Sequence, residues 1–333
     1  MATFGVSQLT IQKALGRLKQ EGLVTSSAGR GTFVGKSLKP ATEPRNILVL
    51  TRERQTDRSN EVARSLHRAL LKREWRAAAL SYSDFAQVTD IVKKTTGFDA
   101  CVLHPRLENV PVKLLAALRA CSRAVIVESY GMEGVDVDSI GIDWPGAVAL
   151  GLRHLIDLGH HNIGLVTMDR PVRAFRAVAA RFRVLHDWAG LDPSVDPVVL
   201  IPSGTEAEVF EHITAYLKSR AGRPGCPTAL VFYLDVYHGA LLLDVVNRTL
   251  PGLAIVMLGF TDVALEHADR LTTVGHSTVA VTERVAVAIE ERWAHPNAPH
   301  CSQHLEPELI VRASTAKRAP RRNTGKAAVT ATG

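Results

Sequence analysis

The stretch DVDSIGIDWPGAVALGLRHLIDLGHHNIGLV, residues 136–166, carries the pattern that decides the fold. It predicts a helix over about 145–158, because Asp143 is a favoured N-cap residue and a proline follows at an early helical position. Gly159 ends this helix, and the apolar run 162–168 then predicts a strand. A helix that leads directly into a buried strand is the repeating unit of a parallel α/β sheet.

The same alternation extends over residues 46–315. Amphipathic helical patterns, such as 60–73, 110–120 and 277–293, lie between most of the apolar runs. We therefore predict the α/β class, with parallel sheets covered on both faces, and the number of units favours two similar lobes over one small domain. The strand-like apolar runs are 46–51, 77–82, 100–104, 124–128, 162–168, 198–201, 229–233 and 255–260.

Composition narrows the class of protein. The chain has 333 residues, of which 46% are hydrophobic and 22% charged, as is ordinary for a soluble α/β protein. No run approaches the roughly 18 apolar residues of a membrane span, and the first residues show no secretory signal. Cys101, Cys121, Cys226 and Cys301 form no C-x-x-C pair, which suits free thiols in a reducing cytoplasm. We predict a cytoplasmic protein.

Positive charge is concentrated at the two ends of the chain. Residues 1–45 hold seven Lys or Arg against two Glu, and residues 316–333 hold five Lys or Arg and no acid, within a net charge of +7. The body is therefore mildly acidic, and we expect a polyanion to contact the ends. Residues 36–45, with two prolines, predict a linker, and residues 316–333 predict a basic disordered tail.

The opening stretch FGVSQLTIQKALGRLKQEGLVTSSAGRGTFVG, residues 4–35, has its own pattern. Ser7 is a suitable N-cap for a helix over about 8–21, and Gly22 ends that helix. A strand then begins, and residues 28–31 predict the glycine turn of a hairpin. The residues that predict a buried helical stripe are Ile11, Ala14, Leu15 and Leu18.

This helix, strand, glycine turn and strand resemble the later part of the GntR-type winged-helix domain. The resemblance implies that the helix enters the major groove and that the turn of the hairpin contacts the adjacent backbone or minor groove. Gln8 and Gln12 present the donor and acceptor that match adenine, so we expect a half-site rich in A·T. Lys13, Arg17 and Arg30 suit phosphates. The predicted DNA-binding residues are Ser7, Gln8, Thr10, Gln12, Lys13, Arg17, Gly29, Arg30, Gly31 and Thr32.

The resemblance covers only the second half of the winged-helix domain. A winged helix-turn-helix has two helices before the turn, which lies here at Gly5-Val6, and only four residues precede that turn. We expect the true start to lie upstream of Met1. The alternative is a DNA-binding module that has lost stable binding.

Four segments of the body, 136–166, 227–235, 259–274 and 305–315, come in the order found in LacI/GalR-type effector domains. That resemblance implies the fold of periplasmic binding proteins, a ligand between two lobes, and dimerisation. It also implies a first lobe of about 46–160 plus 277–294 and a second of 161–275 plus 305–315, with the chain crossing between the lobes three times. The arabinose-repressor subgroup of GntR regulators has this architecture, in which a GntR-type DNA-binding domain is joined to a LacI-type effector domain.

Ligands of open α/β sheets bind beyond the carboxyl ends of the strands, and Trp144 offers a ring for stacking there. At the positions of the family's sugar anchors the chain has Val178, Leu234 and Thr261 instead of Arg, Asn and Asp, so an ordinary sugar looks doubtful and an anionic effector or an unused pocket stays open. The other strand-end candidates are Arg52, Arg54, His104, Arg106, Glu128, Asp143, Arg170, Asp235 and Asp262.

The remaining residue clusters and motifs indicate no further site. His295, His300, Cys301 and His304 lie in a Pro- and Asn-rich stretch that favours a surface loop over a metal site. No nucleophile elbow or phosphate-binding loop is present, so we predict no enzyme, no metal and no cofactor.

We predict a homodimeric DNA-binding transcription regulator, most consistent with a repressor, whose partners are double-stranded operator DNA and a small-molecule effector. The alternatives are a ligand-binding or scaffold protein with a vestigial DNA-binding module, and, with less support, an enzyme on the same fold.

Overall fold

The computed structural model describes residues 12–17, 24–27, 31–34, 45–53, 57–105, 109–129, 132, 134–191, 197–234, 239–262 and 270–315. The chain forms two compact units, residues 1–45 and residues 46–333. Their boundary coincides with the end of the expected linker.

In the amino-terminal unit, residues 12–17 are helical, and β1 (Val24–Ser27) pairs with β2 (Gly31–Val34) as an antiparallel hairpin. The predicted helix and hairpin are therefore confirmed where they are described. The predicted buried stripe is wrong at Ala14, which is exposed, while Leu15 is half-buried. Two four-residue strands offer little apolar surface to cover a helix. Ile11 and Leu18 lie outside the described residues.

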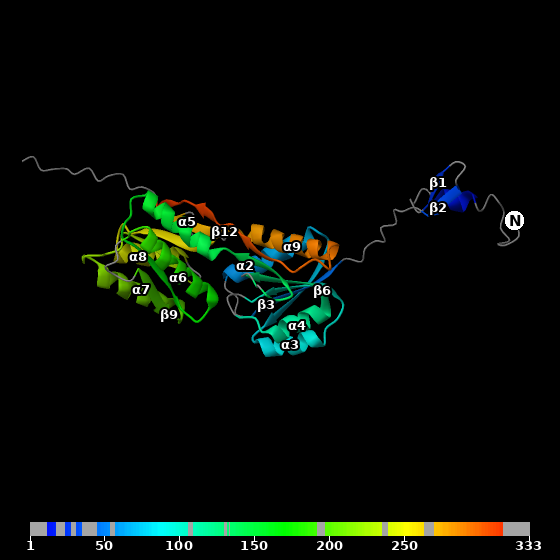
Figure 1. Cartoon of the computed structure of the whole chain (residues 1–333), viewed down its shortest axis with the longest axis horizontal. Coiled ribbons are helices and arrows are strands. Elements are labelled where there is room, and N and C mark those ends of the chain that lie inside the picture. The colour runs from blue at the N-terminus through cyan, green and yellow to red at the C-terminus, as the bar shows by residue number, and fades with distance from the viewer. Residues whose placement is uncertain are drawn as a thin grey trace, which may run out of the picture. The chain divides into compact units, whose positions relative to one another are not determined.

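The first lobe is a six-stranded sheet in the order β13-β7-β6-β5-β3-β4, with all neighbouring strands parallel. Helices α2 and α9 pack on one face and α3 and α4 on the other (Figure 1). Its elements are β3 (Asn46–Arg52), α2 (Asp57–Leu71), β4 (Arg76–Tyr82), α3 (Phe85–Lys93), β5 (Phe98–His104), α4 (Val112–Cys121), β6 (Ser122–Ser129), β7 (Asp138–Ile142), α9 (Thr278–Ala294) and β13 (Ser302–Leu305).

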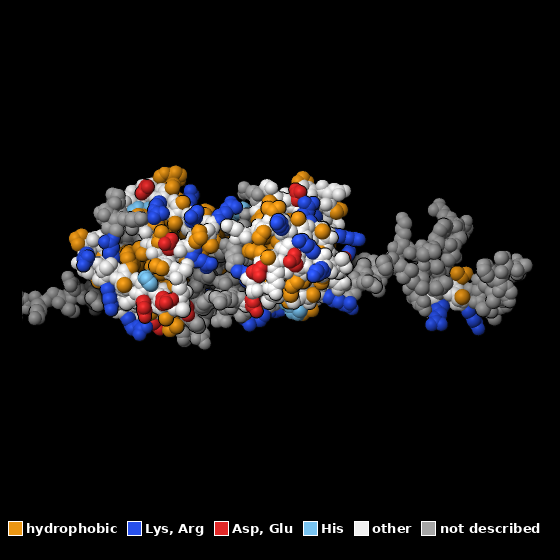
Figure 2. Space-filling view, turned by 90° about the horizontal axis from the view of Figure 1, so that it is seen from below, with side chains coloured by type: hydrophobic (Ala, Val, Ile, Leu, Met, Phe, Trp, Pro, Cys, Tyr) orange, Lys and Arg blue, Asp and Glu red, His pale blue; other side chains and the backbone are white. Residues whose placement is uncertain are grey.

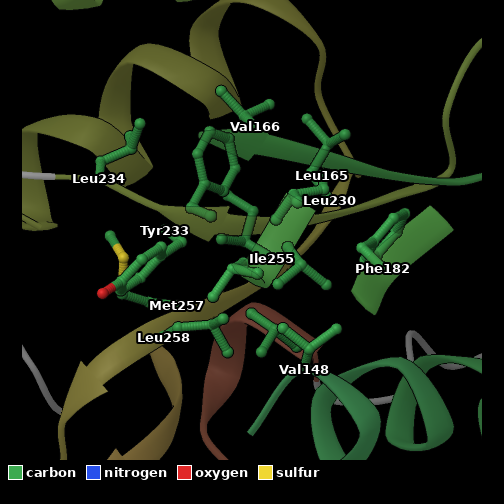
Figure 3. Packing of buried hydrophobic residues seen from close by; sticks show 14 of the residues in the cluster. Val148, Leu165, Val166, Phe182, Leu230, Tyr233, Leu234, Ile255, Met257 and Leu258 are labelled. Carbon is green, nitrogen blue, oxygen red and sulfur yellow. The ribbon is translucent and has the colours of Figure 1, made fainter. Parts of the chain in front are cut away.

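The second lobe repeats this plan in the order β14-β12-β11-β10-β8-β9, in which only β12 and β14 pair antiparallel. Its core is one apolar cluster that includes Phe182, Ile255 and Met257 (Figure 3). Its elements are α5 (Trp144–Asp157), β8 (Ile163–Asp169), α6 (Arg173–Trp188), β9 (Val198–Pro202), α7 (Glu206–Arg220), β10 (Ala229–Tyr233), α8 (Gly239–Thr249), β11 (Ala254–Phe260), β12 (Thr272–His276), β14 (Glu308–Ile310) and the 3₁₀ turn Ala313–Thr315.

All eight apolar runs form strands, as predicted. The segment 305–315, expected to complete the second lobe with the final strand, contains β14, whereas three further strands were not predicted: β7, β12 and β13. They are short and rich in Gly, Thr or Ser, so no apolar run marks them. In β12, Gly275 lies so close to β11 that a Cβ there would come 1.7 Å from the carbonyl oxygen of Gly259. Close backbone packing thus replaces apolar side chains as the signal of this strand.

The chain passes between the lobes three times, after β7, after β12 and after β13. The first lobe was expected to reach about residue 160, but α5 packs in the core of the second lobe through Ala147, Val148 and Leu152. The first crossing therefore lies at Asp143, because the apolar face of α5 matches the second sheet. Since all three crossings start at carboxyl ends of strands, the carboxyl edges of both sheets meet the junction. Among the described residues, no helix is both long and apolar enough to span a bilayer.

Candidate ligand site at the junction of the lobes

The first lobe presents a row of polar side chains along the carboxyl ends of its strands. His104 ends β5, and its Nδ1 is hydrogen-bonded to Oε2 of Glu128 on the neighbouring strand β6; both side chains are buried. Thr51 on β3 pairs in register with His104, and its Oγ1 lies 3.4 Å from Oγ of Ser81. With Nδ1 held by a carboxylate, the imidazole is fixed in orientation and Nε2 is the nitrogen left for a ligand.

Arg52 forms the half-buried rim of this row. Its guanidinium carbon lies 5.6 Å from the ring centroids of both Tyr82 and Phe85, and its Nη1 donates to the carbonyl of Ser83. The cation is therefore held against aromatic faces of its own lobe.

The second lobe presents aromatic rings at the same junction. Asp143 caps α5 by accepting a hydrogen bond from the backbone nitrogen of Gly146 at 2.8 Å, which confirms its predicted role. This cap places Trp144, 8% exposed, with its ring centroid 4.9 Å from that of Tyr233. Among the described residues, the indole Nε1 of Trp144 has no hydrogen-bond partner. An unsatisfied buried donor costs about 1–3 kcal/mol, so it is a natural contact for a ligand acceptor.

His276, the last residue of β12, is another polar residue of this lobe at the carboxyl end of a strand. It is buried, and its Nε2 lacks a partner in the part of the chain that is described. Burial lowers the pKa of His276, although the carboxylates of Glu308 and Asp143 act in the opposite direction. The ring is therefore neutral near pH 7 and can either donate or accept a hydrogen bond.

Thr261 and Asp262 follow β11, and Asp262 contacts the other lobe. Thr261 donates to the carboxylate of Glu308 on β14. Asp262 accepts hydrogen bonds from the first turn of α9 in the other lobe, at 2.6 Å from the backbone nitrogen of Thr278 and 2.9 Å from its hydroxyl. Asp262 thus stabilises the junction as a helix cap rather than being free to contact a ligand.

Two predicted effector contacts are corrected by their burial. Val178 on α6 and Leu234 after β10 both lie in the hydrophobic core of the second lobe. Spacing relative to a family motif placed them at the site, but the packing of α6 and β10 turns both side chains inward. The guanidinium carbon of Arg170 lies 5.9 Å from the ring centroid of Phe175.

Several predicted residues lie outside the described residues, and Gly31 and Thr32 are described only as backbone of β2. Gln12, Lys13 and Arg17 are all exposed on the amino-terminal helix, as a DNA-contacting face requires. The undescribed candidates are Ser7, Gln8, Thr10, Gly29, Arg30, Arg54, Arg106 and Asp235.

Sequence reasoning missed His276, because β12 was not predicted as a strand, and it did not single out Glu308 in the final strand β14. It also read residues 295–304 as a loop, whereas His304 belongs to strand β13 at the edge of the first sheet. His300 instead lies 3.6 Å from Oδ1 of Asp138, which forms a buried ion pair with Arg292. Within the described ranges, no group of three or more His, Cys, Asp or Glu residues could hold a metal ion.

Two segments of the chain match models of known protein families. Residues 1–34 match the gntR family of bacterial regulatory proteins, and residues 152–315 match the periplasmic binding protein-like domain. A curated relative, the arabinose metabolism transcriptional repressor of Halalkalibacterium halodurans, is 25% identical over 344 residues, covering 95% of this chain and 89% of the relative.

Solved structures share the fold of the body. A LacI family transcriptional regulator from Enterococcus faecium with bound ribose superposes with a TM-score of 0.66 at 19% identity, over 82% of this chain and 99% of that one. The complex of the transcriptional regulator CelR with cellobiose gives a TM-score of 0.63 at 16% identity, over 94% of this chain and 92% of that one. Both of these similar proteins hold a sugar.

Proposed function

We propose that this chain, which joins an amino-terminal segment of the GntR family to a LacI-type periplasmic binding protein-like domain, is a transcription regulator whose operator affinity depends on a small molecule bound between the two lobes. The observation that carries the proposal is the presence of both segments in one chain, together with unsatisfied polar groups at the junction of the lobes. Its relatives are described as regulators rather than enzymes.

The amino-terminal helix is the proposed DNA reader. The amide of Gln12 suits an adenine edge, whereas Lys13 and Arg17 suit phosphates, and all three side chains are exposed. The effector domain offers no comparable surface on the face seen in Figure 2, where basic and acidic side chains are interspersed over both lobes. Because its partner is DNA, we expect the protein to act in the cytoplasm.

A sugar or a similar polyhydroxylated molecule is the proposed effector. Its hydroxyl groups can accept a hydrogen bond from Nε1 of Trp144 and exchange one with Nε2 of His276, and its apolar ring face can stack on the aromatic cluster. The His104–Glu128 pair of the first lobe supplies further polar contacts when the lobes close. Ribose and cellobiose in similar structures favour this chemical class.

Closure of the lobes links the effector to DNA. A ligand that contacts both lobes stabilises the closed arrangement, and the three crossings with the Asp262 cap of α9 form the hinge about which the lobes move. In the proposed homodimer, closure changes the spacing of two readers that bind half-sites roughly 34 Å apart.

Selection of bound sequences from a random DNA pool by the full chain tests this function. We expect a two-fold symmetric site rich in A·T, and a loss of binding of at least about tenfold when Gln12, Lys13 and Arg17 are replaced by Ala together. Lys93→Ala on α3 is the matched control, because it removes an exposed cation of the body. Sugar binding without any DNA preference would instead support a ligand-binding protein with a vestigial reader.

A further inference from the structure

Two cysteine thiols of the first lobe lie side by side. Sγ of Cys101, on strand β5, is 3.6 Å from Sγ of Cys121, the last residue of α4. Both are free cysteines. The contact is set by the fold, because α4 runs directly into β6, which pairs with β5 from Phe98 and Ser122 onward. The remaining cysteines are not part of this pair: Cys226 follows α7 in the second lobe, and Cys301 is exposed before β13.

The distance is short enough for a covalent bond to form without refolding. A disulfide has a sulfur–sulfur distance of about 2.05 Å, so the two atoms must approach by about 1.5 Å. Rotation of the two side chains about χ1 can supply a movement of this size, because Cys121 ends a helix and its side chain is only partly enclosed.

The two thiols are not equivalent. Cys101 is buried within its strand, whereas Cys121 is partly accessible to solvent. The hydrogen bond from the Cys101 thiol lowers the pKa of Cys121, while the same hydrogen bond and burial raise the pKa of Cys101. The accessible sulfur is therefore the one that becomes a thiolate, and its neighbour keeps its proton.

We propose that Cys101 and Cys121 form a peroxide-reactive dithiol that closes to an intramolecular disulfide. The thiolate of Cys121 attacks one oxygen of hydrogen peroxide, the O–O bond breaks, and a sulfenic acid forms as hydroxide leaves. The sulfur of Cys101 then attacks the sulfenic sulfur, the S–O bond breaks, and the proton of Cys101 leaves with that hydroxyl as water. Two thiols are oxidised by one peroxide, which is reduced to two waters once the hydroxide is protonated.

The test uses the full chain with Cys226→Ser and Cys301→Ser, which retains only the proposed pair. After treatment with one equivalent of peroxide, the protein is denatured, alkylated with N-ethylmaleimide and weighed. We expect a product lighter by two hydrogens that takes up no maleimide, and a tryptic product that links residues 95–106 to residues 120–123. If both thiols stay reduced after the peroxide treatment, so that each takes up maleimide, the proposal is overturned. Disulfides that form only between two chains would overturn it as well.

Two single replacements in that background separate the roles. Cys101→Ala should leave a sulfenic acid at Cys121 that dimedone traps, because the resolving thiol is gone. Cys121→Ser should leave Cys101 unmodified and fully alkylated after denaturation, because its sulfur is buried. Dimedone labelling of Cys101 in the Cys121→Ser chain, with none of Cys121 in the Cys101→Ala chain, would reject the assigned order of attack. The reciprocal chain, with Cys101→Ala and Cys121→Ser in the presence of native Cys226 and Cys301, should form no intramolecular disulfide.

Discussion

The two lobes share one sheet plan but differ at the edges that meet. In the first lobe, the buried imidazole of His104 is paired with Glu128 across neighbouring strands. In the second lobe, Nε1 of Trp144 and Nε2 of His276 are buried without partners among the described residues. At this edge the imidazole of the first lobe already has a carboxylate partner, whereas Trp144 and His276 of the second lobe carry the free-energy cost of unmade hydrogen bonds that a ligand can relieve. We infer that a ligand binds first to the second lobe and that the first lobe closes over it.

The strongest test of this difference removes the ring that connects the junction to the core of the second lobe. Trp144→Ala should lower the free energy of unfolding by about 3–5 kcal/mol, because a large buried side chain is lost. Trp188→Ala is the matched control: that side chain is 76% exposed at the end of α6 and should change stability by less than about 0.5 kcal/mol. Urea denaturation of both variants measures the contrast, and equal losses would show that Trp144 is not part of the core.

A smaller effect is expected from breaking the pair in the first lobe. Glu128→Ala should cost about 1–3 kcal/mol of unfolding free energy, because His104 is left buried without its partner. Glu128→Gln should lose less, since its amide oxygen still accepts a hydrogen bond. Glu211→Ala on the exposed face of α7 serves as the control. Should Glu128→Ala be as stable as this control, the first lobe would not depend on the pair.

The fold and the site were not equally predictable from sequence. Buried central strands such as β5 and β10 can be predicted from their apolar runs, because both faces of the sheet are covered. Strand β12 does not, since it relies on the close approach of Gly275 to Gly259, and His276 was therefore missed. Asp143 was predictable because a helix cap is a local signal. The burial of Val178 and Leu234 was not, because it depends on which way α6 and β10 face in the assembled core.

The third prediction separates stability from ligand affinity in the second lobe. Trp144→Phe keeps an aromatic ring but removes Nε1, so stability should not fall as in Trp144→Ala. Affinity for the effector should fall by about tenfold, equivalent to about 1.4 kcal/mol. Calorimetric titration with pentoses and hexoses measures this loss, with Trp188→Phe as the control. Unchanged affinity would place the ligand away from this indole.

The smallest expected effect is on the pH dependence of stability. Because burial lowers the pKa of folded His276 below its unfolded value, the unfolded chain binds the proton more readily. The titration of His276 therefore leaves the free energy of unfolding unchanged above the unfolded pKa of about 6.5. As the pH falls below that value, it lowers the free energy of unfolding. In the His276→Gln variant, the free energy of unfolding should change less between neutral and mildly acidic pH than in the unmodified chain. A steeper dependence in the variant would contradict a neutral, buried ring.

The most direct measurement is the fluorescence anisotropy of labelled operator DNA, titrated with the full chain in the absence and presence of a saturating sugar. We predict that one sugar changes the apparent operator affinity and that Trp144→Phe needs a higher concentration of the same sugar for the same change, with its affinity for DNA unaltered when no sugar is present. An operator affinity that no sugar shifts, in a chain that nevertheless binds a sugar by calorimetry, would contradict the coupling between the lobe junction and DNA.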